Sequence, residues 1–281
     1  MNYRHAFHAG NFADVMKHAV LARILSYLAL KPAPFRVIDT HAGCGAYDLS
    51  GHAPNRTGEW REGIGRILGA SLPADVEPVL WPYLSVVAPM MREKRPIYPG
   101  SPIIAQALMR TQDRLICAEK HPEDARKLVA ALAGDRRVKA IEIDGWVALN
   151  AQLPPKENRG LILIDPPFEE PGEFGRLARA FLVAYRKWHS GIFALWYPIK
   201  DIGAVESFVA DLHASNIRKI LRLEMWVDQP DSDGPLAGSG MIIVNPPWTL
   251  KAECERLLAW LAQATARTAR SGCQVVWITP E

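Results

Sequence analysis

The sequence predicts an α/β fold in which helices flank a mostly parallel sheet. Short runs of branched apolar residues alternate along the chain with amphipathic segments of helical length, the pattern of successive strand–helix units. Several runs end on an acidic or glycine-containing turn, and such ends meet at one edge of a parallel sheet. The clearest run, residues 161–164, consists of four branched apolar residues and is stopped by Pro166 and Pro167, which cannot donate to a strand ladder.

The composition is that of a globular chain with one large domain, or one domain carrying an insertion. Its 281 residues can bury a full core, and 49% hydrophobic with 22% charged residues does not indicate disorder. The formal net charge of +3 means that a nucleic-acid surface requires local clustering of basic residues. The four cysteines form no C-x-x-C pair, so we expect free thiols, no metal site and a reducing cytoplasm. We also expect no signal peptide and no membrane span, since long apolar runs are absent.

The N-terminal segment concentrates aromatic, basic and imidazole side chains before a helix. Residues 3–10 hold most of them, and Asn11 can then cap a helix that runs to about residue 30, with Asp14 complementing its dipole. One face of this helix mixes Lys17 and His18 with apolar residues, unlike a plain core stripe. A solvated face with a packed histidine is the alternative, but the density of such residues favours a functional role.

The next predicted strand, residues 35–39, runs into a glycine-containing turn. Gly43 and Gly45 permit a tight turn and a close approach of the backbone to a ligand. A dinucleotide fingerprint needs a third glycine where Asp48 stands, which weakens the hypothesis of a nicotinamide dehydrogenase. The Asp-x-x-x-Gly-x-Gly pattern instead resembles the loop with which class I methyltransferases bind S-adenosylmethionine (SAM).

Residues 50–98 depart from the strand–helix pattern and predict a small inserted helical subdomain. The stretch is rich in proline and contains short amphipathic pieces at 58–68 and 76–91. Residues 1–49 and 99–281 would then form the main domain. Basic residues of the insertion can contact phosphates, although solvated charge is the more common use of such residues. They are Arg56, Arg61, Arg66, Arg92, Lys94 and Arg95.

Two further strands end on or near an acidic residue. Glu119 can accept two hydrogen bonds from vicinal ribose hydroxyls, and Asp144 is placed to accept one from an adenine amine. Each acid alone would more often cap a helix. Together with Asp39 and Asp165, however, they follow the order in which a class I methyltransferase would place its loop, ribose acid, adenine acid and catalytic motif.

The motif Asp165-Pro166-Pro167-Phe168 suits transfer of a group to an exocyclic amine on a flat ring. Phe168 can stack on the ring, while the Asp165 carboxylate and the Pro166 carbonyl accept the two amine hydrogens and turn the nitrogen lone pair toward an electrophile. No metal is required for this chemistry. The motif resembles the Asp-Pro-Pro-aromatic signature of SAM-dependent amino-methyltransferases, and an ordinary Pro-Pro turn is the alternative.

The C-terminal part predicts an antiparallel edge hairpin, with residues 231–235 as its turn. A second match to the broad motif, Asn245-Pro246-Pro247-Trp248, follows the returning strand. Because that strand runs antiparallel, we expect Asn245 to lie away from Glu119 and Asp144, and we assign catalysis to Asp165. The expected strands are 35–39, 114–119, 138–145, 161–164, 191–197 (stopped by Pro198), 219–227 and 238–245, and the expected later helices are 103–109, 174–188 and 205–214.

Segments along nearly the whole chain match one known family. They are Tyr3-Arg4-His5-x-Phe7-His8-Ala9-Gly10-Asn11-x-Ala13-Asp14-Val15-x-Lys17-His18 and residues 39–43, 98–102, 160–167, 194–198, 241–248 and 277–281. With these segments the chain resembles the RlmJ family of bacterial 23S ribosomal RNA adenine-N6 methyltransferases. The resemblance implies a Rossmann-like class I SAM-dependent methyltransferase fold with a small helical insertion.

The resemblance also implies roles for single residues. Tyr3 falls on the position linked to the RNA substrate, and His5 and Lys17 lie in the same motif. Phe168 replaces the tyrosine usual in the family, which preserves the ring for stacking and removes the hydroxyl. The implied cofactor residues, with Gly43 of the loop, are His18, His41, Ser101, Glu119, Asp144, Gly145 and Asp165, and Asp165 is also catalytic.

The hypothesis from the sequence is therefore SAM-dependent N6-methylation of a specific adenosine in 23S ribosomal RNA, by a cytoplasmic monomer that needs no metal. Within the same chemistry, DNA adenine or a protein glutamine is an alternative substrate. From another class, a nucleic-acid-handling protein linked to the use of external DNA is the alternative. A nicotinamide dehydrogenase comes third.

Overall fold

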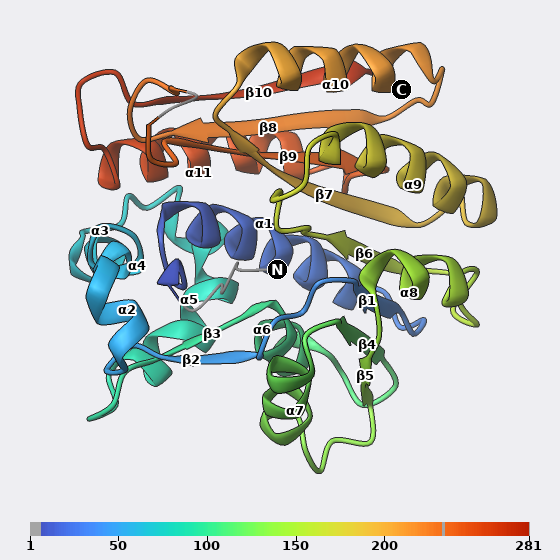
Figure 1. Ribbon diagram of the computed structural model, residues 1–281, viewed down its shortest axis with the longest axis horizontal. Coiled ribbons are helices and arrows are strands. Elements are labelled where there is room, and N and C mark those ends of the chain that lie inside the picture. Colours follow the sequence, from blue (N-terminus) through green and yellow to red (C-terminus); the bar gives the residue numbers. More distant parts are fainter. Residues whose placement is uncertain (1–6, 232–233, 281) are drawn as a thin grey trace.

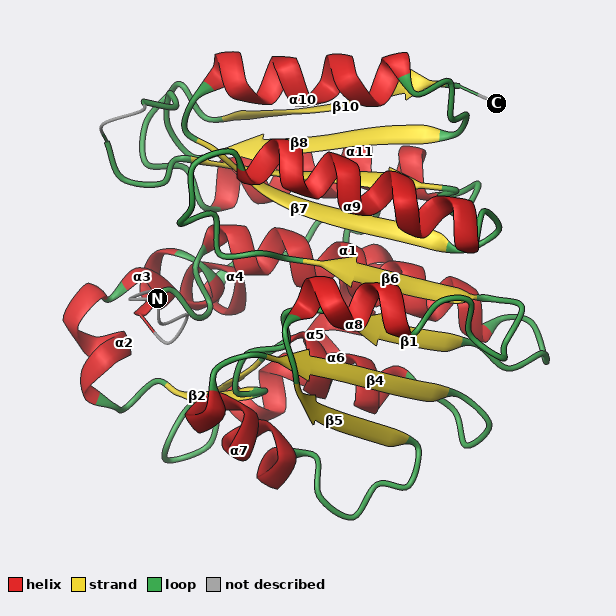
Figure 2. Ribbon diagram, turned by 45° about the vertical axis from the view of Figure 1, so that its right-hand side comes forward, coloured by secondary structure: helices red, strands yellow, loops and turns green. Residues whose placement is uncertain are grey.

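An eight-stranded sheet forms the centre of the protein (Figures 1 and 2), in a computed structural model that describes residues 7–231 and 234–280. Its strand order is β10-β8-β9-β7-β6-β1-β4-β5. The strands are β1 (Arg36–Asp39), β4 (Arg114–Glu119), β5 (Val138–Glu142), β6 (Gly160–Ile164), β7 (Ile192–Ile199), β8 (Ile220–Trp226), β9 (Gly238–Val244) and β10 (Gly272–Thr279).

The pairing confirms the α/β class with a mostly parallel sheet. Four neighbouring pairs are parallel: β5–β4, β4–β1, β1–β6 and β6–β7. β9 lies between β7 and β8 and is antiparallel to both. The predicted β8–β9 hairpin is therefore antiparallel, but it does not lie at the edge of the sheet. β10, which the sequence analysis did not predict, pairs with β8 outside it. None of the β10 residues is fully buried, but Val275 and Trp277 pack against one core and Ile278 against the other, so these contacts support the strand besides its pairing.

Helices cover both faces of the sheet and create two cores. One face packs against α1 (Phe12–Ala29), α6 (Ser101–Leu108), α7 (Pro122–Ala131) and α11 (Leu250–Ala264), and the other against α8 (Gly145–Ala151), α9 (Glu173–Lys187) and α10 (Ile202–Ala214). β6 explains why two cores are needed. Leu161 and Leu163 enter the first core and Ile162 and Ile164 the second, because successive side chains of a strand point to opposite faces.

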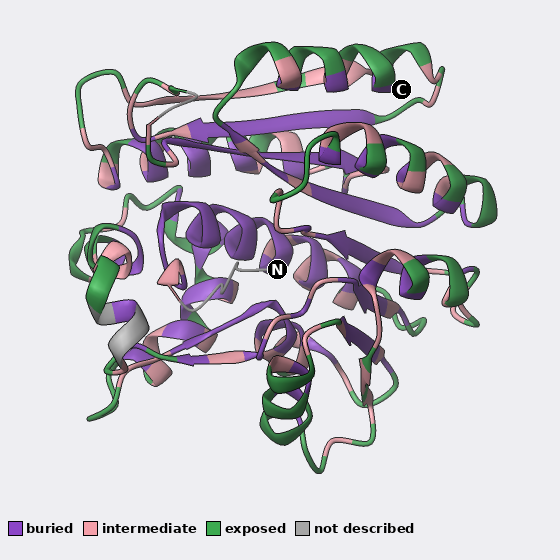
Figure 3. Cartoon of the chain, viewed as in Figure 1, coloured by how far each residue is buried: buried purple, intermediate pink, exposed green. Residues whose placement is uncertain are grey.

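α1 is buried nearly all round, as the purple helix in the centre of Figure 3 shows. It packs against the sheet, α6, α11 and the inserted helix α5 (Glu77–Met91), and 14 of its 18 residues are buried. The Asn11 side chain accepts from the Asp14 amide and caps the helix as predicted. This burial places the polar residues Asp14, Lys17 and His18 inside the protein rather than on a solvated face.

The chain between β1 and β4 also contains a two-stranded ladder and further helices. They are β2 (Ala46–Asp48), α2 (His52–Thr57), α3 (Glu59–Glu62), α4 (Ile64–Gly69) and β3 (Ile97–Pro99). Apolar residues of α4 and α5 join the same core as α1. The division of the chain at residues 50 and 98 stays a prediction.

β7 corrects one predicted boundary. The strand was expected to stop at Pro198, but it continues to Ile199. β6 pairs with β7 only up to Leu195, so the last four residues of β7 pair with β9 alone. On the side that faced β6, this part of β7 has no partner strand, so a proline such as Pro198, which lacks the N–H, breaks no ladder bond there. Across the described ranges, no helix combines the length and the apolarity that crossing a membrane requires.

A close approach between β7 and β9 depends on Gly240. A Cβ atom at this position would lie 2.2 Å from the ring of Tyr197. We expect Gly240→Ala to lower the free energy of unfolding by about 1–3 kcal/mol, because the overpacked ring must move. Urea denaturation measures this. Gly69→Ala is the control, since no atom lies within 4 Å of its Cβ, and an equal loss in both variants would contradict the packing argument.

Candidate active site

A cavity of about 1050 Å³ lies at the edge of the sheet where the parallel strands end. The cavity is lined by every described residue that the sequence assigned to catalysis, to cofactor binding or to the RNA substrate motif. These are Lys17, His18, His41, Gly43, Ser101, Glu119, Asp144, Gly145, Asp165, Pro166 and Phe168. Tyr3 and His5 lie outside the described residues, so their roles stay predictions.

The buried ammonium of Lys17 joins α1 to the strand-end motif. Its Nζ lies 2.6 Å from Asp165 Oδ2 and 2.9 Å from Asp14 Oδ1, and only 5% of the Lys17 side chain is exposed. Burial by itself lowers the pKa of Lys17, but the carboxylates of Asp14 and Asp165 raise it above its usual value. Lys17 thus remains charged and fixes the Asp165 carboxylate. The sequence placed Lys17 in a substrate motif and gave no signal of this contact, which joins residues 148 positions apart.

Phe168 is held by other aromatic rings. Its φ of 51° lies in the left-handed region, which a bulky residue rarely adopts. Its ring makes edge contacts with Phe174 at 4.9 Å and Trp196 at 5.9 Å between centroids. Trp196 also lies 5.6 Å from Lys17 Nζ and donates from Nε1 to Ser239 Oγ at 2.9 Å. Trp196 was not among the predicted site residues, although the predicted strand 191–197 already contained it.

The glycine turn after β1 holds the carboxylate of Glu119. Gly43 N–H donates to Oε2 at 2.8 Å and His121 N–H donates to Oε1 at 2.7 Å. Gly43 has a φ of 61°, and a Cβ there would lie 2.2 Å from the Tyr47 hydroxyl. Each carboxylate oxygen accepts two hydrogen bonds, so Glu119 retains acceptor capacity toward the cavity.

Asp144 differs from its predicted place. β5 ends at Glu142, and Asp144 is the N-cap of α8. Its Oδ1 accepts from the amides of Trp146 and Val147, and its Oδ2 lies 3.0 Å from Lys120 Nζ. Although burial raises its pKa, Lys120 and the amides outweigh this and hold the pKa below its usual value. The structure therefore shows Asp144 as a helix cap, the alternative role, and Asp144 also lines the cavity.

Gly145 lets the first turn of α8 approach the loop after β1. A Cβ here would lie 2.1 Å from the carbonyl oxygen of Thr40 and 2.7 Å from the His41 ring. The His41 ring makes an edge contact with Trp146, with 5.2 Å between centroids. Burial lowers the pKa of His41 to about 4, so the imidazole is neutral at pH 7.

Asp39, at the end of β1, is buried beneath the cavity. Ser101 Oγ donates to its Oδ2 at 2.7 Å. Burial raises the pKa of Asp39 to about 7, and Asp165 adds to the rise. His18 Nδ1 lies 2.7 Å from the Tyr98 hydroxyl, which in turn lies 3.1 Å from that of Tyr83 on α5. This chain of contacts connects the cavity to the inserted helices.

The second motif lies elsewhere, as predicted. Asn245 follows β9 at the opposite edge of the sheet, and its side-chain amide donates to the carbonyl groups of His189 and Gly191, each at 2.8 Å. It lines a separate pocket of about 190 Å³ with Pro246 and Pro247. Within the two described stretches, no three His, Cys, Asp or Glu side chains are grouped as metal ligands.

The hydrogen bond from Ser101 to Asp39 gives a pH-dependent expectation. The pKa of Asp39 rises on folding from 3.8 to about 7, so the folded state loses stability as pH increases through this range. Ser101→Ala raises the pKa of Asp39 further, because the Ser101 donor favours the ionised form. We expect a loss of about 1.5–3 kcal/mol in unfolding free energy at pH 8 and a smaller loss at pH 5.

Urea denaturation at both pH values tests this expectation. Ser85→Ala is the matched control, since its exposed hydroxyl donates to a carbonyl oxygen that does not titrate. Equal losses for Ser101→Ala at pH 5 and pH 8 would contradict the link to Asp39.

Comparisons with known proteins agree over the full length of the chain. The family described as "RsmJ: Ribosomal RNA large subunit methyltransferase D, RlmJ" matches residues 32–279. Ribosomal RNA large subunit methyltransferase J of Escherichia coli (strain K12) is 42% identical over 284 residues, covering 100% of both chains. The protein of the same name from Haemophilus influenzae (strain ATCC 51907 / DSM 11121 / KW20 / Rd) is 39% identical over 285 residues, again covering 100% of both. The crystal structure of protein LPL1258 from Legionella pneumophila (str. Philadelphia 1) has 34% identity and a TM-score of 0.87, covering 96% of this chain and 98% of that one.

Proposed function

The chain belongs to the RlmJ family of ribosomal RNA large subunit methyltransferases, and from this premise we propose that it transfers a methyl group from SAM to N6 of an adenosine in 23S ribosomal RNA. One observation carries the assignment of the site. The cavity that holds Asp165 and Phe168 is also lined by Gly43, Glu119 and Asp144, so an amine-binding motif and a nucleoside-binding set of acids meet in one space.

SAM fits the part of the cavity around the glycine turn. Glu119 accepts hydrogen bonds from the ribose diol, and Gly43 and Gly145 allow the close packing against Tyr47, Thr40 and His41 that shapes this part of the cavity. The neutral imidazole of His41 brings no positive charge near a sulfonium. His18, Ser101 and Asp144 complete the proposed set. Bound there, the cofactor supplies an electrophilic methyl group.

The protein's own part in the reaction is to orient the amine and receive its proton. Lys17 occupies Asp165 Oδ2, so Oδ1 is the oxygen that accepts a hydrogen from the adenosine amine. The Pro166 carbonyl accepts the other hydrogen, and Phe168 stacks on the base. As the new N–C bond forms and the methyl–sulfur bond breaks, Asp165 takes the proton released from nitrogen. The target adenosine enters from an unpaired RNA segment.

The N-terminal arm belongs to the same proposal. Tyr3 and His5 contact the RNA substrate. Support comes from His8, which lines the cavity with its Nδ1 3.0 Å from Glu59 Oε1 on α3. The enzyme acts as a monomer in the cytoplasm, where its RNA substrate is found. DNA adenine and protein glutamine would use the same chemistry, but family membership favours RNA over both and over the handling of external DNA.

Removal of the proposed acceptor tests the catalytic assignment. We expect Asp165→Ala to lower kcat for 23S ribosomal RNA by about 10²–10⁴-fold, because the amine loses its acceptor. Transfer of labelled methyl groups measures kcat, and calorimetry checks that SAM still binds. Asn245→Ala in the second motif is the matched control, since Asn245 lies at the other edge of the sheet. Full turnover by Asp165→Ala, or loss of turnover in Asn245→Ala despite a folded protein, would refute the assignment.

The aromatic ring after the prolines gives a separate expectation. Phe168→Tyr should keep kcat/KM within about threefold, because stacking needs only the ring. Phe168→Leu should lower kcat/KM by about 10-fold or more, since base stacking contributes about 1–3 kcal/mol. Steady-state kinetics with RNA as the varied substrate distinguish them. An unchanged kcat/KM in Phe168→Leu would exclude a stacking role.

A further inference from the structure

The edge of the sheet opposite the cavity carries a large surplus of positive charge. The parallel strands begin at this edge, and the loops leading into them meet there with the first residues of β1 and β4. These segments are 30–36, 109–114, 132–137, 152–159, 188–191 and 215–219. They hold ten Lys and Arg against three Asp and Glu, a net charge of +7, whereas the whole chain has +3. We call this surface the basic edge, and its cations are Lys31, Arg36, Arg110, Arg114, Arg136, Arg137, Lys156, Arg159, Arg218 and Lys219.

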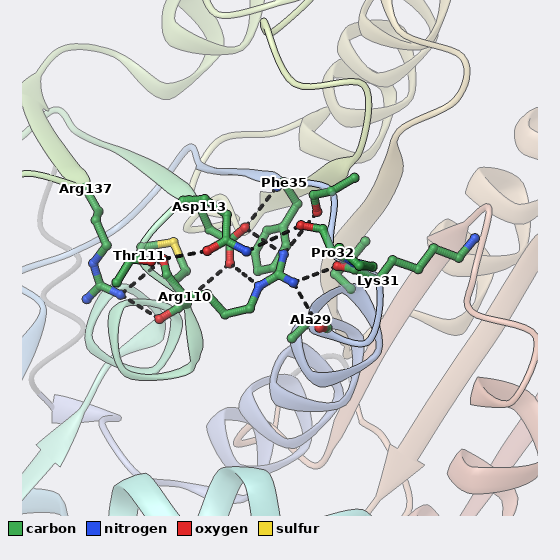
Figure 4. A network of polar contacts seen from close by, with 12 residues as sticks. Ala29, Lys31, Pro32, Phe35, Arg110, Thr111, Asp113 and Arg137 are labelled. Carbon is green, nitrogen blue, oxygen red and sulfur yellow. Dashed lines mark hydrogen bonds and ion pairs between the residues drawn. The ribbon is translucent and has the colours of Figure 1, made fainter.

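Each of the three acids at the basic edge is already held by an arginine. Arg110 Nε lies 2.9 Å from the fully buried Asp113, and Figure 4 shows this pair beside Arg137. Arg137 lies 2.6 Å from Asp135, and Arg36 lies 2.8 Å from Glu157. The acidic side chains are thus neutralised locally, and the remaining cations keep their charge.

Two arginines of this edge have an internal role. Arg110 donates to the carbonyl groups of Ala29 and Lys31 (Figure 4) and to that of Ala33. Arg159 donates to those of Leu28 and Ala33, so both arginines satisfy carbonyl groups at the end of α1 and just after it. Lys31, Arg136 and Lys156 differ, because all three are exposed and none forms an ion pair with residues 7–231 or 234–280. No internal contact explains these three charges.

The shape of the basic edge fits a long polyanion. From β8 to β5 the sheet has six strand spacings of about 4.8 Å, so the cations extend over about 29 Å. Trp248, with 81% of its surface exposed, follows β9 at the same edge, where the Asn245 amide bonds to the Lys219 carbonyl. Exposed aromatic rings beside basic residues are platforms on which unpaired bases stack.

The cavity edge has the opposite charge. Its loops, residues 40–45, 120–121, 143–144, 165–172, 200–201, 227–231 and 265–271, contain four Lys and Arg against seven Asp and Glu. Such a surface suits a cationic cofactor and repels phosphates. Because phosphate contacts supply most of the affinity of proteins for nucleic acids, an RNA substrate needs an attractive surface elsewhere on the molecule.

We propose that the basic edge binds the phosphate backbone of the ribosomal RNA substrate outside the segment that carries the target nucleotide. The proposal rests on the proposed function, since it takes RNA as the substrate. The basic edge raises affinity for long substrates and leaves the chemistry at the cavity unchanged.

A triple variant tests the proposal. Lys31→Gln, Arg136→Gln and Lys156→Gln together remove three exposed charges. With a long 23S ribosomal RNA fragment, we expect KM to rise about tenfold at 0.1 M salt and the slope of log KM against log salt to fall by about 2–3, close to one counterion per lost phosphate contact. The kcat and the affinity for SAM should not change, and a short hairpin around the target should show a smaller rise in KM.

The matched control is Arg126→Gln, Arg179→Gln and Arg256→Gln, which removes the same charge from exposed positions on α7, α9 and α11. Equal rises in KM for both triple variants, or no rise in the first, would overturn the proposal. Fluorescence anisotropy with a labelled RNA duplex that lacks the target adenosine measures RNA binding without methylation, so it tests the basic edge separately from the proposed function. Weaker binding by the first variant alone supports the basic edge even if the wild-type enzyme fails to methylate RNA, a result that would refute only the proposed function.

Discussion

The buried ion pair between Lys17 and Asp165 is the contact on which the arrangement of the site depends. It connects the first helix of the chain to the end of a central strand, and Asp14 holds the same ammonium from the other side. A buried charge is costly unless it is paired and hydrogen-bonded, so Asp14 and Asp165 together offset the cost of burying the Lys17 ammonium with α1. The pair therefore links the position of α1 to the orientation of the carboxylate that we propose as the acceptor.

Around this pair, titratable groups differ in pKa and in hydrogen bonding because their surroundings differ. Asp39 and Asp165 lie close enough to interact, but burial raises the pKa of Asp39 to about 7. His41 is neutral because burial lowers its pKa to about 4. Glu119 is instead anchored by two backbone amides, which fix the position of its carboxylate. Burial, rather than residue type, thus decides the pKa values of Asp39 and His41 around the cavity.

The distribution of charge over the sheet extends this division. The loops at the cavity edge are acidic, and the loops at the opposite edge are basic. In a parallel sheet the two kinds of loop alternate along the chain, so a balanced net charge of +3 conceals two surfaces of opposite sign. An enzyme with a cationic cofactor and a polyanionic substrate can use both surfaces.

The sequence by itself determined the strands of the parallel sheet and the residues at their ends. The run 161–164, the glycine turn after residue 39 and the acid Glu119 were predictable because apolar runs, glycines and prolines act locally along the chain. Only the tertiary structure decided the contact of Lys17 with Asp165, the pairing of β10 with β8 at the edge, the role of Asp144 as a cap and the passage of β7 through Pro198. These features depend on pairing and burial between segments that are far apart in the sequence, and a local sequence pattern does not predict which distant segment packs against it.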